Sequence, residues 1–330
     1  MKGNKTIYEL AILGRITWNL HSLNNEGSIG NVVEPRTLKL ADGTTTDGIS
    51  GEMLKHIHAA RMWELEKDKS KFCPACRILG PMRAEQNPNV TQLGRGQEIE
   101  ATRRALQDCV LCDVHGFLVQ RPTIHRQSTV EFGWAVGLRG EVHRDIHQHA
   151  RHIVGERPGS EGQPPAQQGV EAPSEEKRPE AAPPPVQMLY SRPTRSGVYA
   201  LVSVFQPWRI GLNTINYEYL EGLDRQSRYQ LALQAYRTMF LRTDGAMTST
   251  RLPHLEAFEG TIVVSQANFP VPVVSPLKEG YREEIEALAK ASGEGFECIR
   301  FDDLVSFVNA LQGFEDGKPY ELKMSEQTEG

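Results

Sequence analysis

Four of the five cysteines lie in two pairs with the spacing Cys-x-x-Cys, at 73–76 and 109–112. A two-residue spacer lets both thiolates of a pair face one centre. Four soft thiolates in a tetrahedral array favour zinc and leave no open position for water. We therefore expect a structural zinc ion, with the ligands Cys73, Cys76, Cys109 and Cys112. Four reduced thiols without a metal, and a site in which His115 replaces one cysteine, are the alternatives.

Two polar segments offer hydrogen-bond donors that suit phosphate groups. One follows the first predicted strand, at residues 21–28, and combines small polar side chains with backbone N–H groups that can hold phosphates without reading bases. An ordinary turn accounts for those residue types equally well. The other, residues 244–251, begins Asp-Gly, is rich in hydroxyl groups and ends in a guanidinium. It lacks the Gly-Lys-Ser/Thr ending of a Walker loop.

Two further groups of residues could serve a polyanion. Phosphate contacts and a stacking surface are expected from Arg121, His125, Arg126 and Trp134. A dense histidine cluster comprises His143, His147, His149 and His152. A catalytic metal site would need an accompanying carboxylate and a rigid scaffold, so we favour an exposed polar hairpin near RNA for this cluster.

The elements that must position these residues are read from hydrophobic periodicity and from turn residues. Strands are expected at residues 6–20, 116–120, 128–138, 197–206 and 261–266, and helices at residues 51–67, 98–107, 224–241, 281–291 and 302–311. Ser50 and Asp224 are the expected N-caps of the first and third helices. Residues 21–50 are expected to be loop. This order favours an α+β fold with helices on one face of a sheet, and an RRM-like (ferredoxin-like) sheet is the simplest closed solution.

Residues 155–187 differ from the rest of the chain in composition. They hold 8 of the 20 prolines and no aromatic residue. Such a segment buries too little apolar surface to offset its ordering entropy, so we expect disorder. The segment is not expected to be a domain boundary, because strand-like sequence resumes directly after it.

The formal net charge is −5, but its distribution is uneven. Residues 188–253 are basic and residues 254–330 are acidic, and a local basic surface can bind phosphates whatever the total charge. The N-terminal residues lack the apolar core of a signal peptide, and no apolar run is long enough to span a membrane. We expect a cytoplasmic protein without a membrane partner.

Five segments, taken in order, resemble one family of proteins. They are residues 14–38, 112–119 (CDVHGFLV), 128–138 (STVEFGWAVGL), 187–202 and 245–254 (GAMTSTRLPH). The chain resembles, over about residues 6–270, the DevR-type CRISPR-associated autoregulators. Those proteins are the repeating backbone subunits of type I CRISPR surveillance complexes (Cascade).

The resemblance implies an RRM-like palm, a helical insertion and a thumb hairpin. The palm would comprise residues 1–50, 113–138 and 196–312, and the zinc-clamped insertion residues 51–112. The thumb would comprise residues 139–195, with the proline-rich segment at its tip, and residues 313–330 would form a C-terminal tail. The implied partners are the guide crRNA, target DNA, other copies of the chain and other Cascade subunits.

The resemblance also implies where the guide lies. No enzymatic activity is expected, because neither a nucleophile–base pair nor an open metal site appears with suitable spacing. The residues expected to contact guide RNA are Asn19, His21, Ser22, Asn24, Asn25, Arg36, Arg121, His125, Arg126, Met188, Tyr190, Thr248, Ser249, Thr250 and Arg251. Two alternatives stay open. A type III-like subunit would cut bound RNA with a loop aspartate, Asp42 or Asp47. A zinc-dependent transcription regulator would need a recognition helix, and no helix-turn-helix with a basic recognition helix is evident.

Overall fold

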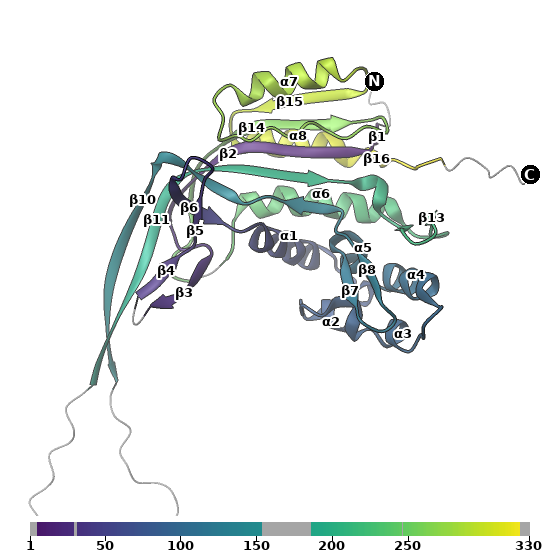
Figure 1. Ribbon diagram of the computed structural model, residues 1–330, viewed down its shortest axis with the longest axis horizontal. Coiled ribbons are helices and arrows are strands. Elements are labelled where there is room, and N and C mark those ends of the chain that lie inside the picture. The colour runs from purple at the N-terminus through teal and green to yellow at the C-terminus, as the bar shows by residue number, and fades with distance from the viewer. Residues whose placement is uncertain (1–4, 30–31, 154–185, 246, 324–330) are drawn as a thin grey trace, which may run out of the picture.

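A mostly antiparallel sheet of ten strands organises the chain (Figure 1). The computed structural model describes residues 5–29, 32–153, 186–245 and 247–323. Seven strands form the main path of the sheet, in the order β15 (Phe296–Phe301), β14 (His254–Ser265), β2 (Glu9–His21), β11 (Val186–Phe205), β10 (Ala135–Ile153), β6 (Thr45–Ile49) and β5 (Thr37–Lys39). The expected α+β class is confirmed.

Strand β2 lies in the middle of the sheet and separates two cores. Its side chains alternate between the faces, as strand geometry requires. The main core receives Leu10, Ile12, Ile16 and Trp18, all at most 1% exposed. The smaller core on the other face receives Ala11 and Leu13. Both faces are buried, which explains why the predicted strand is apolar almost throughout.

Helices cover both faces. The main core is covered by α1 (Gly51–Leu65), α6 (Arg225–Leu241) and α8 (Leu304–Glu315), and α7 (Tyr281–Ala291) packs over the smaller core. The predicted caps are present: the Ser50 hydroxyl accepts from Met53 N, and the Asp224 carboxylate accepts from Ser227 N at 2.9 Å. All four of these helices were predicted within a few residues. None of the described helices is both long and apolar enough to cross a membrane.

A helical lobe extends from the end of α1 (lower right in Figure 1). It comprises η1 (Lys69–Lys71), α2 (Pro74–Arg77), η2 (Arg83–Gln86), α3 (Pro88–Thr91), α4 (Glu98–Asp108), α5 (Val110–His115), and the pair β7 (Phe117–Val119) and β8 (Ile124–Arg126). The side chain of Asp113 anchors the lobe to the sheet domain. Its carboxylate pairs with Arg126 at 2.5 Å and with Arg228 of α6 at 2.7 Å.

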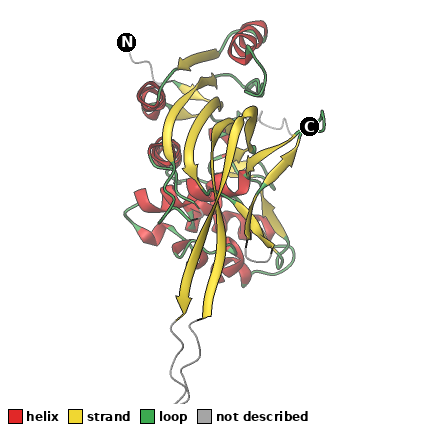
Figure 2. Cartoon of the chain, turned by 90° about the vertical axis from the view of Figure 1, so that its left-hand side faces the viewer, coloured by secondary structure: helices red, strands yellow, loops and turns green. Residues whose placement is uncertain are grey.

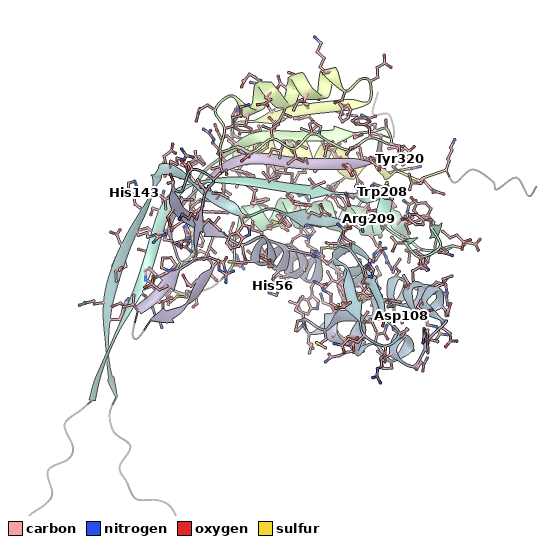
Figure 3. The ribbon with its side chains drawn as sticks, in the orientation of Figure 1. His56, Asp108, His143, Trp208, Arg209 and Tyr320 are labelled. Carbon is pink, nitrogen blue, oxygen red and sulfur yellow. The ribbon has the colours of Figure 1, made fainter. Side chains whose placement is uncertain are left out.

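The short remaining elements frame the ends of the sheet. They are β1 (Thr6–Ile7) paired with β16 (Lys318–Pro319), β9 (Val130–Phe132) on β11, η3 (Pro207–Arg209), and β12 (Leu212–Asn213) paired with β13 (Glu218–Tyr219). Tyr8 stacks on Trp208 and meets Tyr320 edge to face near these elements. Figure 3 shows Trp208, Arg209 and Tyr320 together at the end of the sheet opposite His143.

Strands β10 and β11 form a long antiparallel hairpin that projects as one twisted arm (Figures 1 and 2). Their pairing runs from Val136 opposite Ala200 out to Ile153 opposite Val186. The segment predicted to be disordered, residues 155–187, lies outside the described residues except for its last two. Those two, Val186 and Gln187, belong to β11, so disorder was wrong for them.

The prediction of loop for residues 21–50 is wrong. The segment contains β3 (Asn25–Ile29), β4 (Val32–Pro35), β5 and β6. Strand β4 pairs with β11 at Ser191, and β6 pairs with β10 at Ala135 and Val136. Strands β3 and β4 pair with each other, as do β5 and β6, and strands from distant parts of the sequence complete the pairing of β4 and β6. The Gly, Asn and Asp residues of the segment favour turns, but this tertiary pairing overrides that local preference.

The neighbouring strands at the root of the hairpin all shift register at one level. The shifts fall between Gly137 and Val142 in β10, between Arg195 and Gly197 in β11, and between Leu255 and Ala257 in β14. On β2 the shift coincides with Leu20, whose φ of 55° lies in the left-handed region that a leucine rarely adopts. Aligned bulges bend a sheet, and the bend marks the point where the hairpin leaves it.

Candidate metal centre and nucleic-acid interface

The four paired cysteines converge on one point inside the lobe. Their sulfur atoms all lie within 4.8 Å of one another, and Cys112 Sγ is 3.8 Å from Cys73 Sγ and 3.9 Å from Cys76 Sγ. A tetrahedral centre with Zn–S bonds of about 2.3 Å holds its sulfur atoms about 3.8 Å apart. All four residues are buried, none more than 3% exposed. The donor set therefore fits a tetrahedral thiolate-bound metal ion.

Two short helices place these cysteines. Cys73 and Cys109 are the residues that precede α2 and α5, and Cys76 and Cys112 lie in the first turn of those helices. The backbone N–H of Cys112 donates to Cys109 Sγ at 3.3 Å, a contact that favours a thiolate at Cys109. The Cys-x-x-Cys spacing thus corresponds to one helical turn that points both sulfur atoms the same way.

The environment of the cluster requires a cation if its sulfurs are thiolates. Burial raises the pKa of the Cys112 thiol well above its ordinary value, because a thiolate there loses its hydration. Adjacent thiolates repel one another in such a site. A bound dication removes both penalties and deprotonates its ligands.

The alternative ligand His115 is engaged elsewhere. Within the described chain, the group that can hold a metal consists of the four cysteines alone. His115 instead donates through Nε2 to Nδ1 of His58 at 3.0 Å, while Nε2 of His58 donates to Ala232 O at 3.0 Å. Burial lowers the pKa of His58 to about 3, so this chain consists of neutral imidazoles and connects α5 to α1 and α6.

The first polar segment is held rigidly at the hairpin root. His21 contacts the Tyr199 hydroxyl at 3.0 Å through Nε2, and the Ser22 hydroxyl donates to Pro193 O. Both side chains are fully buried, so the expectation that they contact RNA is corrected. The strand end directs them inward, where they fix the loop that follows.

Leu23 is buried, whereas Asn24 and Asn25 are partly exposed and are positioned by other elements. Arg195 donates to Asn24 O at 3.2 Å, and Asn24 Oδ1 accepts from Ser50 N at the start of α1. Asn25 Nδ2 lies 3.6 Å from Met247 Sδ, which brings the two predicted phosphate-binding segments together. Sequence reasoning missed Arg195; a lone arginine in an otherwise neutral stretch, residues 193–206, was the available signal.

The second segment is a compact turn before β14. The N–H groups of Thr250 and Arg251 both donate to Met247 O, at 3.1 and 3.0 Å, and the Thr248 hydroxyl donates to Gly245 O. Ser249 and Thr250 are exposed. Asn19, beside the turn in the sheet, donates to the carboxylate of Glu256 at 2.5 Å. The turn therefore presents hydroxyl groups next to the hairpin root.

Arg126 is the clearest departure from the predicted interface. Its side chain is fully buried, and besides Asp113 it donates to Leu212 O and Arg209 O, both at 2.7 Å. A guanidinium with these partners has no face for a phosphate, so that prediction is corrected. Arg121 and His125 are exposed, but they lie on the β7–β8 pair of the lobe. The structure does not bring them to the hairpin root.

The remaining predicted contacts line the hairpin and its base. The guanidinium of Arg36 lies 5.7 Å from the Trp134 ring centre. Met188 and Tyr190 lie on β11 in register with Arg151 and His149 of β10. His143, His147 and His149 share one face of β10 by their even spacing; His152 lies on the same strand.

The two candidate catalytic aspartates have different surroundings. Asp47 on β6 is 1% exposed; it forms an ion pair with Arg144 and lies 3.8 Å from Arg195. It is thus occupied as a structural counterion. Asp42 lies at the exposed β5–β6 turn, where hydrogen bonds from Thr44 lower its pKa.

Comparison with known proteins points to one family. The model of the family described as "CRISPR-associated negative auto-regulator DevR/Csa2" matches residues 12–286. No curated protein matches the chain. Among solved structures, a chain titled "CRISPR RNA-guided surveillance complex, pre-nicking" is similar with a TM-score of 0.49 and 12% identity, over 96% of each chain. A chain titled "CRISPR RNA-guided surveillance complex" has a TM-score of 0.40 and 11% identity, over 96% of this chain and 94% of that one.

Proposed function

The chain belongs to the DevR/Csa2 family of CRISPR-associated proteins, and on that premise we propose that it is a backbone subunit of a type I surveillance complex (Cascade). Copies of the chain bind along one guide crRNA and assemble with other Cascade subunits. Each copy holds the sugar–phosphate chain and leaves the bases free to pair with target DNA. Sequence recognition then belongs to base pairing, as in other RNA-guided complexes.

The observation that carries this proposal is the convergence of polar segments at the hairpin root. The loop after β2, the turn before β14 and the hairpin itself come from three distant parts of the sequence. Asn25 contacts Met247, and Arg251 contacts His149 of β10. Hydroxyl, amide and guanidinium groups at such a junction contact phosphates without reading bases. A subunit that must accept every guide sequence needs contacts of this kind.

We assign the sheet domain to an RRM-like palm and the β10–β11 hairpin to a thumb, in line with the family. The cysteine cluster holds a structural zinc ion ligated by Cys73, Cys76, Cys109 and Cys112. Zinc is favoured over other metals because four thiolates in tetrahedral array suit it and leave no coordination position open. The ion clamps a lobe whose helices α2 and α3 are each only four residues long.

We further propose that the chain binds nucleic acid without cutting it. The burial of Asp47 between two arginines supports this view, because a catalytic carboxylate needs access to substrate. Asp42 remains exposed. Cleavage of complementary RNA by the wild-type complex, abolished by Asp42→Ala, would instead establish a type III-like nuclease.

Purification tests the central proposal. The chain, co-expressed with the neighbouring subunits and a CRISPR array, is expected to copurify with RNA of uniform length and mixed sequence. Removal of the array should remove the RNA and the higher assemblies. Protein that emerges free of RNA alongside its assembled partners, or that binds one duplex operator in preference to RNA, would overturn the proposal.

A further inference from the structure

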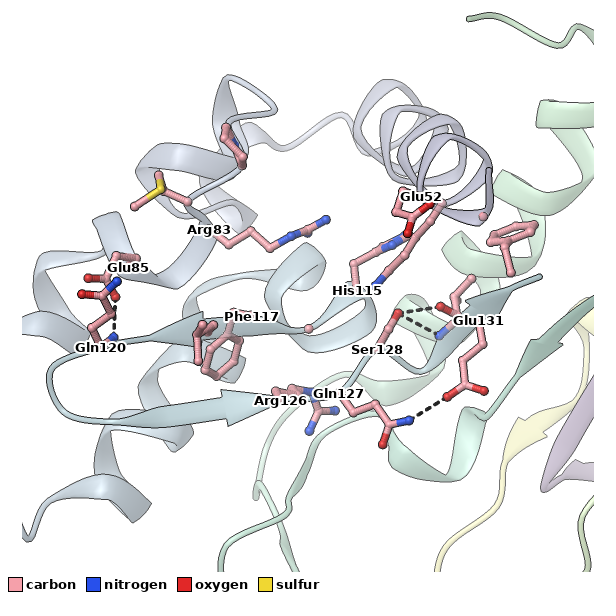
Figure 4. Close-up of a pocket in the computed structure, with 18 of the residues that line it drawn as sticks. Glu52, Arg83, Glu85, His115, Phe117, Gln120, Arg126, Gln127, Ser128 and Glu131 are labelled. Carbon is pink, nitrogen blue, oxygen red and sulfur yellow. Dashed lines mark hydrogen bonds between the residues drawn. The ribbon is translucent and has the colours of Figure 1, made fainter. Parts of the chain in front are cut away.

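An open groove lies between the start of α1, the lobe and strand β9 (Figure 4). Its volume is about 810 Å³, within the range of roughly 300–1,000 Å³ that is typical of ligand sites. Lys55 of α1 and Arg83 of η2 both line it, and Figure 4 shows Arg83 reaching from the lobe toward His115 and Glu52. Of the groove residues, only Trp134, whose ring lies near the Arg36 guanidinium, adjoins the interface at the hairpin root.

The cations of the groove lack anionic partners, whereas most of its carboxylates have partners. Within the described residues, neither Lys55 nor Arg83 forms an ion pair with a carboxylate. Glu85 accepts from Gln120 N at 2.8 Å, and Glu131 accepts from Gln127 Nε2 at 2.9 Å (dashed in Figure 4). Glu52, at the start of α1, is exposed. The charges of Glu131 and Glu52 raise the pKa of Lys55, but within the described residues neither carboxylate forms an ion pair with its ammonium group. An added anion would therefore be the direct contact partner of both cationic groups.

The two cations also act on each other. Burial, and then the charge of Arg83, lower the pKa of Lys55. Lys55 is partly buried, and a neighbouring like charge disfavours its ammonium form. The Arg83 backbone has a φ of 45°, a conformation that residues other than glycine rarely adopt, and its guanidinium donates to Leu111 O at 3.5 Å. The lobe thus holds the guanidinium in place beside a second positive charge, an arrangement that an anion would relieve.

The rest of the groove wall suits a nucleotide. Phe117, Phe132 and Trp134 line it, and aromatic side chains provide surfaces for bases and sugars. His56, the neighbour of Lys55, is exposed on the side of α1 away from the sheet (Figure 3). A simple carboxylate ligand would pair with the two cations but would make no contact with the aromatic side chains, so a nucleotide fits the groove better.

We propose that Lys55 and Arg83 together bind a phosphodiester of a nucleic-acid strand in this groove. The site is separate from the contacts at the hairpin root. It rests on the proposed function, because it requires the chain to carry guide RNA. The phosphodiester can come from the guide or from the strand that pairs with it, and the experiment separates these two sources.

The test uses the assembled ribonucleoprotein. Lys55→Gln/Arg83→Gln is compared with Arg95→Gln/Lys290→Gln, which removes two exposed positive charges, one in the lobe and one on α7. Affinities for guide RNA and for a complementary strand are measured over a salt series. The groove variant should lose on the order of tenfold in affinity for the strand that occupies the groove, with a salt slope shallower by about one unit. The control variant should bind both strands as the wild type does.

A second readout identifies the source. Acylation of Lys55 is followed by mass spectrometry on the free protein, with guide alone and with guide plus complement. Protection by guide alone assigns the phosphodiester to the guide, and protection only after the complement is added assigns it to the paired strand. Equal affinities for the groove and control variants, together with unchanged acylation, would overturn the inference. So would protection by partner subunits without nucleic acid, which would indicate an acidic protein segment. These outcomes are distinguishable from a failure of the proposed function, in which the wild-type protein itself would bind no guide RNA.

Discussion

The guanidinium of Arg251 donates a hydrogen bond to Nε2 of His149 across 3.1 Å. The two residues are 102 positions apart in the sequence, and the contact joins the turn before β14 to the hairpin arm. A guanidinium can only donate, so His149 Nε2 is the acceptor. The turn and the arm therefore form one continuous polar surface, on which the first prediction depends.

Arg251→Ala should weaken guide RNA binding to a similar extent for all guide sequences. Arg251 supplies a charge and donors without facing any particular base, so its loss removes about one unit from the salt slope of the binding constant. Fluorescence anisotropy with several guides of unrelated sequence measures both quantities. Arg103→Ala, on an exposed face of α4, is the matched control. A loss confined to some guide sequences would contradict a phosphate contact.

Cys112→Ser should release the metal and loosen the lobe. The serine hydroxyl oxygen is a poorer zinc ligand than a thiolate. The cysteine cluster makes up much of the core of the lobe, so loss of the ion should loosen it. Elemental analysis should find about one zinc per wild-type chain and markedly less in the variant. Limited proteolysis should then cut within residues 66–126 before the sheet domain. Cys298→Ser, outside the cluster on β15, should retain zinc; a zinc-free wild type would refute the assignment.

Asp113→Asn should destabilise the fold by about 3–5 kcal/mol. The substitution preserves shape but removes the negative charge between Arg126 and Arg228, and Arg126 is fully buried. A buried guanidinium without its counterion is costly because it has been removed from water. Chemical denaturation measures the free energy of unfolding. Glu321→Gln breaks the more exposed pair with Arg225 and should cost at most about 1 kcal/mol.

Stability should fall as the pH falls below about 6.5. The pKa of His58 is lowered to about 3 in the folded chain, so the unfolded chain takes up its proton first. Between these two pKa values the unfolded state binds more protons, and the free energy of unfolding decreases with each step toward acid. One such histidine contributes up to about 1.4 kcal/mol per pH unit. Denaturation curves from pH 7 to 5 should show a shallower slope for His58→Asn; an unchanged slope would contradict a neutral buried imidazole.

The helices and the central strands were predictable because their signals are local. The caps at Ser50 and Asp224 and the apolar periodicity of β2 lie within a few residues of the elements they define. Strands β3 to β6 gave no such signal. Thr45–Ile49 is polar and contains a glycine, and its strand is formed by pairing with β5 through Thr45 to Asp47 and with β10 through Gly48 and Ile49. Pairing between distant segments is not encoded in either segment alone.

The candidate sites too were predictable where the signal is local in the sequence and not where it depends on distant contacts. The cysteine cluster was predictable because two Cys-x-x-Cys pairs in one chain are typical of metal-binding sites. Arg126 was wrongly predicted to contact RNA, because the sequence alone does not distinguish an arginine that binds phosphate from one that forms a buried ion pair, here with Asp113. Lys55 and Arg83 drew no attention, since only the packing of the lobe on α1 brings them to one groove.

Strand β11 runs without interruption from Val186 to Phe205, so its outer half belongs to the arm and its inner half to the middle of the sheet. Residues Gly197 to Phe205 are hydrogen-bonded along β2. A force that pulls the arm along the axis of β11 would act in shear on the backbone hydrogen bonds between β11 and β2, and it would act on many of them at once. A hairpin attached through a flexible joint would swing instead. The arm is therefore rigidly connected to the core of the subunit, and a force on the arm is transmitted to the central sheet.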